Sequence, residues 1–309
     1  MRSLIAVAAF LVLAVPGWAQ PNASARIDPS RFGTKQPDAA FGAFQRGLYI
    51  TALNIGLPRA KEGDPAAQTL VAEIYARGLG VPRNPKEAAR WYAAAAEQGV
   101  AEAQFQYALI LMDGRLADPD ETRAMALLTE AAKSGSRLAQ FNLAQLIVKR
   151  EPGPAGFAKA VEHYRAAAEA GLADAQYAMA QIRTNGSDGS PPDDAVARDW
   201  LRKAARQNFD TAQVDLGTWL VEGRGGDRDL KGGFGWIRRA AQGGNVAAQA
   251  RLAKLYVGGL GVEPDGIEGA AWYIISRRAG LHDTYMEDYK LGLTDEEKKQ
   301  AIARANALR

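Results

Sequence analysis

The chain has 309 residues, of which 47% are hydrophobic and 24% charged, and this balance is that of a folded protein rather than a disordered one. Its formal net charge is only +3 at neutral pH, and no long run of Lys and Arg interleaved with aromatic residues occurs, which argues against nucleic acid as a partner. The absence of cysteine excludes disulfides, thiolate metal sites and a lipid-modified cysteine.

Residues 1–19 have the pattern of a secretory signal peptide, with a basic residue near the start. An apolar stretch runs from Leu4 to Val15, and small residues at Gly17 and Ala19 fit a signal-peptidase site. This stretch is shorter than the about 20 residues that a membrane-spanning helix needs, which favours cleavage after Ala19 over a retained membrane anchor. We therefore expect a periplasmic or secreted protein with no membrane span after cleavage.

Residues 20–40 are rich in Pro, Ser and Gly, and this composition predicts a flexible linker. Residues 41–62 predict a capping element, which is either a lone helix or a helical hairpin. Terminal units of repeat arrays have one face in water, so their sequences depart from the pattern of the inner units.

Residues 63–280 carry a repeat with a period of 36 or 37 residues. An Ala-Gln pair recurs six times, and a small residue follows each Gln four positions later; the glutamines are Gln68, Gln104, Gln140, Gln176, Gln213 and Gln249. A second series runs in step with them: Trp91, Leu127, His163, Trp200, Trp236 and Trp272. Self-similarity at this period predicts an all-α, right-handed solenoid of about six stacked helical hairpins.

The first unit shows how each hairpin is built. Asp64 is a good N-cap and Pro65 a good first residue for the first helix of the unit, helix A. A turn with Gly78 and Gly80 leads to the second helix, helix B, which we expect to begin at Pro85. The small residue four positions after each Gln lets the two helices approach closely, and the large residues of the second series fill the space between hairpins.

Three later units depart from this pattern. Residues 150–154 and 185–192 replace the turn in the third and fourth units, so we expect irregular loops there, with the second the most mobile. The fifth unit places Gly232, Gly233 and Gly235 at the start of helix B. Each glycine costs a helix roughly 1 kcal/mol, which predicts a weak point or hinge.

Residues 281–309 predict a C-terminal cap of two helices. The first is short and covers 283–292. Thr294 and Glu297 have the spacing of a capping box, which predicts the start of a final helix that ends near Leu308.

The repeat consensus resembles the Sel-one-like repeat (SLR) family, a relative of the tetratricopeptide repeats. It reads A-Q-x-x-(apolar)-(A/G), then G-x-G-V, then A-x-x-W, then A-A-x-x-G, over about residues 63–280. The resemblance implies a solenoid whose motif residues are structural. It also implies an adaptor role, since members of this family act in secretion, signalling or envelope assembly.

The sequence offers no assembled catalytic group, so we expect no enzyme activity, no cofactor and no metal site. His163 lies in the Trp series and predicts a packed imidazole, and His282 stands beside Asp283 in a C-terminal turn. No Gly-x-Ser-x-Gly motif occurs, and Gly223 to Gly226 lack the Lys and Ser/Thr of a phosphate-binding loop.

The helix A positions that the repeat does not fix are the candidate binding residues. Positions two and five after each Gln share one helical face, which the family resemblance places on the concave side of the superhelix. The residues that we expect to bind a protein or peptide there are Gln106, Leu109, Asn142, Gln145, Gln181, Asp215, Thr218, Arg251 and Lys254.

We therefore expect a non-catalytic scaffold or adaptor, exported to the periplasm, that binds a protein or peptide partner of the cell envelope in its concave groove. The sequence is also compatible with two alternatives: a structural protein that self-assembles through an exposed end, and a cell-envelope hydrolase. The sequence does not indicate the oligomeric state.

Overall fold

The computed structural model describes residues 38–186 and 190–308, which form sixteen α-helices joined by turns. The expected signal peptide (1–19), nearly all of the expected linker and the centre of the 185–192 loop lie outside these residues. The helices are α1 (Ala39–Gln45), α2 (Tyr49–Lys61), α3 (Pro65–Arg77), α4 (Pro85–Glu97), α5 (Ala101–Asp113), α6 (Glu121–Lys133), α7 (Arg137–Arg150), α8 (Pro154–Glu169), α9 (Ala173–Asn185), α10 (Asp194–Arg206), α11 (Asp210–Glu222), α12 (Leu230–Gln242), α13 (Val246–Gly258), α14 (Gly266–Arg278), α15 (Thr284–Leu291) and α16 (Asp295–Ala307).

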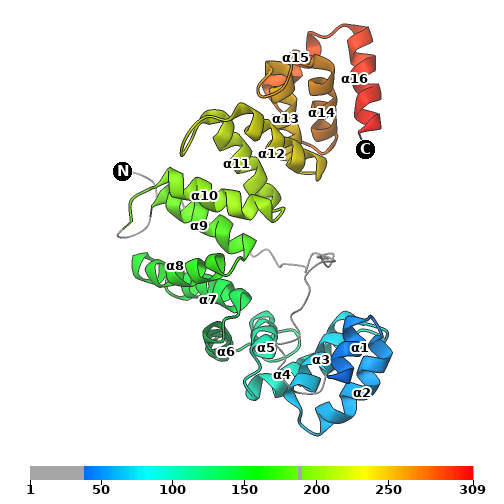
Figure 1. Cartoon of the computed structure of the whole chain (residues 1–309), viewed down its shortest axis with the longest axis vertical. Helices are drawn as coiled ribbons and strands as arrows, with labels where there is room; N and C mark the ends of the chain where they lie inside the picture. Colours follow the sequence, from blue (N-terminus) through cyan, green and yellow to red (C-terminus); the bar gives the residue numbers. More distant parts are fainter. Residues whose placement is uncertain (1–37, 187–189, 309) are drawn as a thin grey trace.

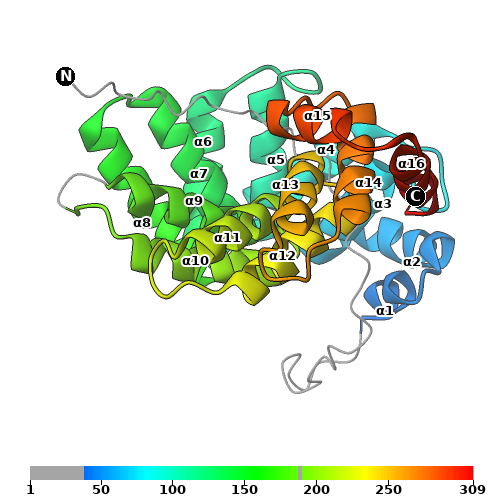
Figure 2. The same cartoon turned by 90° about the horizontal axis from the view of Figure 1, so that it is seen from above.

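Each helix from α1 to α14 packs against the next one, α16 packs on α14, and the helices build one curved stack with α1 at one end and α16 at the other (Figure 1). Seen from above, α5, α7, α9, α11 and α13 lie nearer the centre of the projection, and α6, α8, α10, α12 and α14 lie outside them (Figure 2). Helices A of these repeats therefore line the inside of the curve and helices B the outside, and the expected all-α solenoid is confirmed.

The residues at the ends of the helices act as the sequence predicts. The Asp64 carboxylate accepts hydrogen bonds from the backbone N–H groups of Ala66 and Ala67, at 2.9 and 3.2 Å. Asn84 caps α4 in the same way, and Gly78 takes the left-handed conformation (φ 69°) that ends α3. Asn208 adopts the same conformation (φ 65°) where the other units have Gly, as Asn tolerates it better than other side chains.

Small residues set the distance between the two helices of each repeat. Ala72, Ala108, Ala144 and Ala180 are fully buried or nearly so, and Gly217 and Ala253 continue the series in the last two repeats. At Gly217 an added Cβ would lie 2.9 Å from the carbonyl oxygen of Gly233. Gly233 therefore has a packing role: the backbones of α11 and α12 approach too closely there for a side chain, and α12 is a continuous helix instead of a broken one.

The repeated glutamines form hydrogen bonds that join successive hairpins. The side-chain amide of Gln213 donates to the Ala205 carbonyl oxygen (3.1 Å), eight residues back at the end of the preceding helix B. The same bond forms in four other repeats, from Gln68, Gln140, Gln176 and Gln249. Each of these carbonyls lies in the last turn of its helix and also accepts a bond from the backbone N–H three residues later, as Ala205 does from Asn208 at 3.1 Å. The glutamine therefore adds a second bond, which comes from the next helix A. The motif residue thus joins one hairpin to the next.

The Trp series is buried only near the ends of the array. Trp91 and Trp272 are 6% and 4% exposed, whereas Trp200 and Trp236 are half-buried. The central rings therefore keep part of their surface accessible on the outer helices α10 and α12.

Both ends of the stack are capped. The N-terminal segment is a hairpin of α1 and α2, not a lone helix, and α1 begins at Ala39, within the residues expected to be linker. Arg59 of α2 joins this cap to the first repeat, with ion pairs to Asp38, the N-cap of α1 (2.9 Å), and to Asp64, the N-cap of α3 (2.5 Å). At the other end, α16 begins with the predicted capping box of Thr294 and Glu297.

No helix in the described ranges is both long and apolar enough to cross a membrane.

Candidate binding face

The nine predicted binding residues lie on five consecutive A helices, α5, α7, α9, α11 and α13, which form the inside of the curve (Figure 2). We call this set the inner face; it comprises Gln106, Leu109, Asn142, Gln145, Gln181, Asp215, Thr218, Arg251 and Lys254. Because consecutive A helices stand side by side, residues that are 36 or 37 apart in sequence become neighbours along the stack.

Three of these polar side chains bond within their own helix. Gln106 donates to Glu102 (2.8 Å), Asn142 to the carbonyl oxygen of Leu138 (2.9 Å), and Thr218 to that of Val214 (2.8 Å). Each of these bonds spans one helical turn and none joins two repeats. The Gln145 side chain is exposed and that of Gln181 half-buried, so amide groups follow one another along α5, α7 and α9. Such groups can both donate to and accept from the backbone of an extended peptide.

Leu109 is less available than its neighbours. It is half-buried and packs against the core that contains Phe105 and Leu111. Leu109 therefore offers the inner face only a partly exposed apolar side chain.

Asp215 is a half-buried charge of the inner face. Tyr177 on α9 donates its hydroxyl to the Asp215 carboxylate on α11 at 2.9 Å, and this bond joins the inner helices of two repeats. Burial raises the pKa of Asp215, and the Tyr177 bond and the positive charges of Arg251 and Arg224 oppose that rise only in part. The pKa of Tyr177 is raised as well, because its ring is buried and the carboxylate is near.

Tyr177 was not among the predicted residues, although it directly follows the repeated Gln176. The sequence signal that could have found it is a tyrosine directly after the motif Gln, in the repeat before one that carries an acidic inner-face residue. A similar bond occurs in the first repeat, where the Tyr92 hydroxyl donates to Glu73 at 2.7 Å.

The C-terminal end of the inner face is joined to the cap. Lys254 forms an ion pair with Asp283 at 2.5 Å, and its ammonium lies 6.0 Å from the ring centre of Tyr285. Arg251 is exposed and is the cation nearest in sequence that remains on the open part of the face. Lys254 thus contributes to the junction with α15, which the sequence pattern alone did not show.

His163 is a structural residue. Its Nδ1 lies 2.7 Å from the side-chain oxygen of Gln140, whose amide nitrogen already donates to the carbonyl of Ala132. The Gln140 oxygen must therefore accept, so Nδ1 carries the proton. Burial lowers the pKa of His163, which favours this neutral form. Within the described residues, no group of three or more His, Asp or Glu side chains is placed to hold a metal ion.

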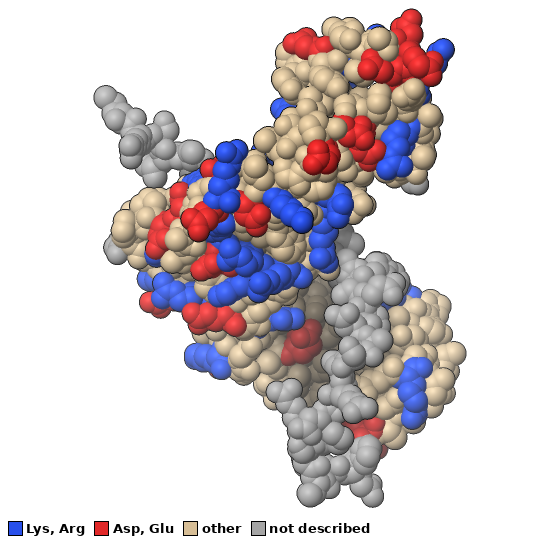
Figure 3. Space-filling view, turned by 45° about the horizontal axis from the view of Figure 1, so that its top comes forward, with Lys and Arg blue, Asp and Glu red and all other residues tan. Residues whose placement is uncertain are grey.

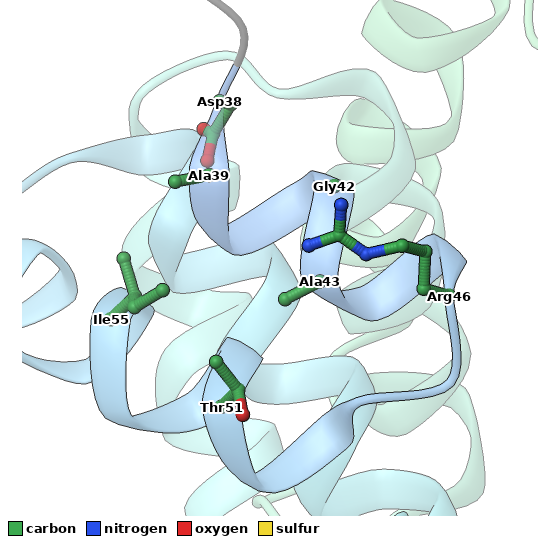
Figure 4. A pocket seen from close by; sticks show the side chains of 7 residues that line it. All are labelled: Asp38, Ala39, Gly42, Ala43, Arg46, Thr51 and Ile55. Carbon is green, nitrogen blue, oxygen red and sulfur yellow. The ribbon is translucent and has the colours of Figure 1, made fainter.

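Two open depressions lie at the ends of the stack, away from the inner face. One has a volume of about 470 Å³ between α1 and α2, where Ile55, Thr51 and Arg46 surround Ala43 (Figure 4). The other, of about 460 Å³, lies between α12 and α16 and is lined by Trp272, Ile275 and Leu308. Both are open surface depressions, the first in the N-terminal cap and the second between the last repeats and the end of α16.

Comparison with known families gives one match, to the Sel1 repeat. The family model matches six consecutive segments: residues 65–100, 101–136, 137–172, 173–209, 211–245 and 246–281. These segments cover the helix pairs from α3–α4 to α13–α14. No curated protein matches the chain significantly.

Solved structures show the same fold. A protective antigen of uropathogenic Escherichia coli, described as having an SLR fold, is 26% identical with a TM-score of 0.54; the alignment covers 84% of this chain. The chain spans only 64% of the length of that antigen. A Sel1 repeat protein from Oxalobacter formigenes is 25% identical with a TM-score of 0.65, over 79% of this chain and 97% of that one.

Proposed function

The chain belongs to the Sel1 repeat family, and we propose that it is a non-catalytic scaffold of the bacterial cell envelope that binds an extended segment of a partner protein on its inner face. Sel1 repeat proteins are typically scaffolds for protein interactions and generally have no catalytic activity. The binding face and the envelope location are the parts specific to this proposal.

The observation that carries the proposal is the alignment of amide side chains on successive inner helices. Gln106, Asn142, Gln145 and Gln181 follow one another along α5, α7 and α9, and none of them belongs to the repeat motif that holds the fold together. An extended peptide presents alternating N–H and C=O groups, which such amides can bind in both senses. The partly buried Leu109 adds an apolar contact beside them.

The location rests on the sequence of residues 1–19. If they are a signal peptide, the protein recovered from the envelope fraction begins at Gln20. N-terminal sequencing or intact-mass measurement of the protein from fractionated cells tests this part. Recovery of a chain that still begins at Met1 in the cytoplasmic fraction would overturn the envelope assignment and leave the scaffold role untouched.

A photo-cross-linking amino acid at Gln145 tests the inner face in living cells. We expect it to capture one dominant partner, identified by mass spectrometry. The same amino acid at Ala126, which is exposed on the outer helix α6, is the matched control and should not capture that partner. Capture of the same partner from Ala126 alone would move the binding surface to the outside of the curve.

A second test removes the recognition groups and keeps the fold. Replacing Gln106, Asn142, Gln145 and Gln181 together with Ala should abolish capture of the partner, because the peptide loses its hydrogen-bonding groups. Far-UV circular dichroism should match that of the wild type, since Ala is the best helix former. Undiminished capture by a folded quadruple variant would show that the amides do not bind the partner.

The two alternatives make different predictions. Self-assembly would require the end depressions at α1–α2 or α12–α16 to meet another copy, and sedimentation velocity would then show mass that rises with protein concentration. A hydrolase would show turnover that a single substitution abolishes without loss of fold. The inner-face amides favour neither of these, and the scaffold role is the conclusion.

A further inference from the structure

Two neighbouring outer helices concentrate positive charge. Together α10 and α12 contain seven Lys and Arg residues and only two acidic ones. Figure 3 shows Lys and Arg side chains gathered over the middle of the stack. We call the outward-facing members the basic strip; it comprises Arg202, Lys203, Arg206, Arg238 and Arg239. None of them belongs to the inner face or to the repeat consensus.

Among the six repeats, only these two have a pair of cations at equivalent positions of helix B. Arg202 and Lys203 stand two and three positions after Trp200, and Arg238 and Arg239 stand at the same positions after Trp236. The other four repeats place different residues there: Ala93 and Ala94, Thr129 and Glu130, Arg165 and Ala166, Ile274 and Ile275. The fold therefore does not require cations at these positions.

A hydrogen bond between α12 and the turn after α10 links the two halves of the strip. The Arg239 guanidinium donates to the side-chain oxygen of Asn208 at 2.5 Å, in the turn directly after α10. This bond brings the cation of α12 to the end of α10, where Lys203 and Arg206 are exposed. The strip thus runs from the last turn of one outer helix to the last turn of the next.

Aromatic rings lie beneath these cations. The Lys203 ammonium is 3.8 Å from the ring centre of Trp200, and the Arg239 guanidinium is 6.0 Å from that of Trp236. Both rings are half-buried, unlike Trp91 and Trp272. A ligand that binds these cations therefore also meets part of an aromatic surface.

Most of the strip is not neutralised within the protein. Among residues 38–186 and 190–308, no carboxylate forms a salt bridge with Lys203, Arg206 or Arg238, whereas Arg202 pairs with Asp199. Helix dipoles favour cations in a last turn, yet α4 ends without one and Lys133 of α6 is paired with Glu130. The dipole alone does not explain the strip, because it acts equally on every outer helix.

We infer that the basic strip docks an acidic polypeptide segment of a partner protein. Charge complementarity selects the occupant: unpaired cations beside aromatic faces suit Glu and Asp side chains separated by apolar ones. A broad anionic surface such as a bilayer fits less well, because the exposed carboxylates of Asp199 and Asp210 flank the strip and the whole chain carries a net charge of only +3. This docking does not depend on the proposed role of the inner face.

Fluorescence anisotropy with a short fluorescein-labelled peptide of alternating Glu and Ala tests the inference on the whole chain. We expect binding that weakens as salt is added, because exposed charges are screened. Reversing three charges, in Lys203→Glu/Arg206→Glu/Arg238→Glu, should weaken it by at least about tenfold. A matched reversal elsewhere, Arg46→Glu/Lys61→Glu/Lys86→Glu, changes the net charge equally and should change affinity by less than about twofold.

A neutral variant, Lys203→Gln/Arg206→Gln/Arg238→Gln, keeps the test decisive if the reversed variant fails to fold, and should also bind weakly. Equal losses in the strip and control variants would overturn the inference, since binding would then follow net charge alone. Failure of the wild type to bind the peptide would also overturn it. If the wild type then sedimented with phosphatidylglycerol vesicles and the strip variant did not, the strip would be assigned to a membrane surface instead.

Discussion

At the scale of single residues, the repeat motif and the candidate binding face use the same residue type for different purposes. Gln213 is 3% exposed and joins two hairpins through the carbonyl of Ala205, whereas Gln145, a third of the array away, is exposed on the inner face. The difference follows from where each residue lies on its helix: the motif Gln faces the preceding helix B, and the other faces solvent. Burial decides whether an amide stabilises the fold or remains available to a ligand.

We expect Gln213→Ala to destabilise the protein by about 1 kcal/mol, because the bond from α11 to the end of α10 is lost while the Ala205 carbonyl keeps its bond from the Asn208 N–H. Urea unfolding followed by circular dichroism measures the change. Gln145→Ala is the matched control on α7 and should stay within about 0.5 kcal/mol of the wild type. Equal losses in the free energy of unfolding for the two substitutions would show that the motif glutamine does not stabilise the junction between hairpins.

Asp215 gives the inner face a dependence on pH. Burial raises its pKa above the value of an unfolded chain, so the folded state binds the proton more strongly and the contribution of Asp215 to stability falls as pH rises between the unfolded and folded pKa values. Asp215→Asn mimics the protonated form. We expect it to have a higher melting temperature than the wild type at neutral pH, with the difference vanishing in acid. A wild type that is more stable than Asp215→Asn at neutral pH would mean that Tyr177 and Arg251 outweigh the cost of burial.

At the scale of elements, close helix packing explains glycines that look unfavourable in sequence. A Cβ at Gly233 would lie 2.6 Å from the side chain of Val221 and 2.7 Å from the Gly217 carbonyl oxygen. A Cβ at Gly235, two residues on in the same helix, would meet nothing within 4 Å. The glycines of α12 are therefore not equivalent: the neighbouring helix requires Gly233 but not Gly235.

The pair Gly233→Ala and Gly235→Ala separates packing from helix propensity. Gly233→Ala should destabilise the protein, because overpacking costs about 1–3 kcal/mol and exceeds the gain in propensity. Gly235→Ala should stabilise it by up to about 1 kcal/mol, the propensity difference between the two residues. Thermal melts of both variants check this, and stabilisation by both would show that α11 and α12 can move apart at no cost.

At the scale of the whole molecule, the array is a chain of nearest-neighbour contacts whose ends need covers. Helices α15 and α16 close the C-terminal end over the core that contains Trp272, and Met286 of α15 is fully buried in that core. Without them, the apolar surface of α14 would face water. Solenoids depend on such terminal units for solubility.

A chain that ends at Gly280 should therefore melt at a lower temperature and associate at concentrations where the full chain does not. Light scattering after size-exclusion chromatography measures the association. A truncated chain as soluble and stable as the full one would show that the cap is dispensable.

Glu287→Gln is a milder perturbation of the same cap. Bonds from Lys290, Arg277 and Tyr273 hold the pKa of Glu287 at about 2. The stabilisation that Glu287 gives the wild type should be present above the pKa of this group in the unfolded chain, and it should be lost as pH falls through its pKa in the folded protein.

The sequence by itself determined the architecture, because the architecture is local and periodic. Caps such as Asp64 and Thr294, turns such as Gly78 and the small residues at Ala72 and its equivalents depend on neighbours in the chain or one helix away. The same reasoning placed the inner-face residues on five successive helices, since helical spacing fixes which residues share a face.

Only the tertiary structure decided how side chains from different repeats meet. The bond from Tyr177 to Asp215, the ion pair of Lys254 with Asp283 and the approach of Arg239 to Asn208 each join residues 29 to 38 positions apart. Such contacts depend on the rise and rotation from one hairpin to the next. A repeat pattern shows that units stack, but the angle between them comes from the packing of all their side chains together.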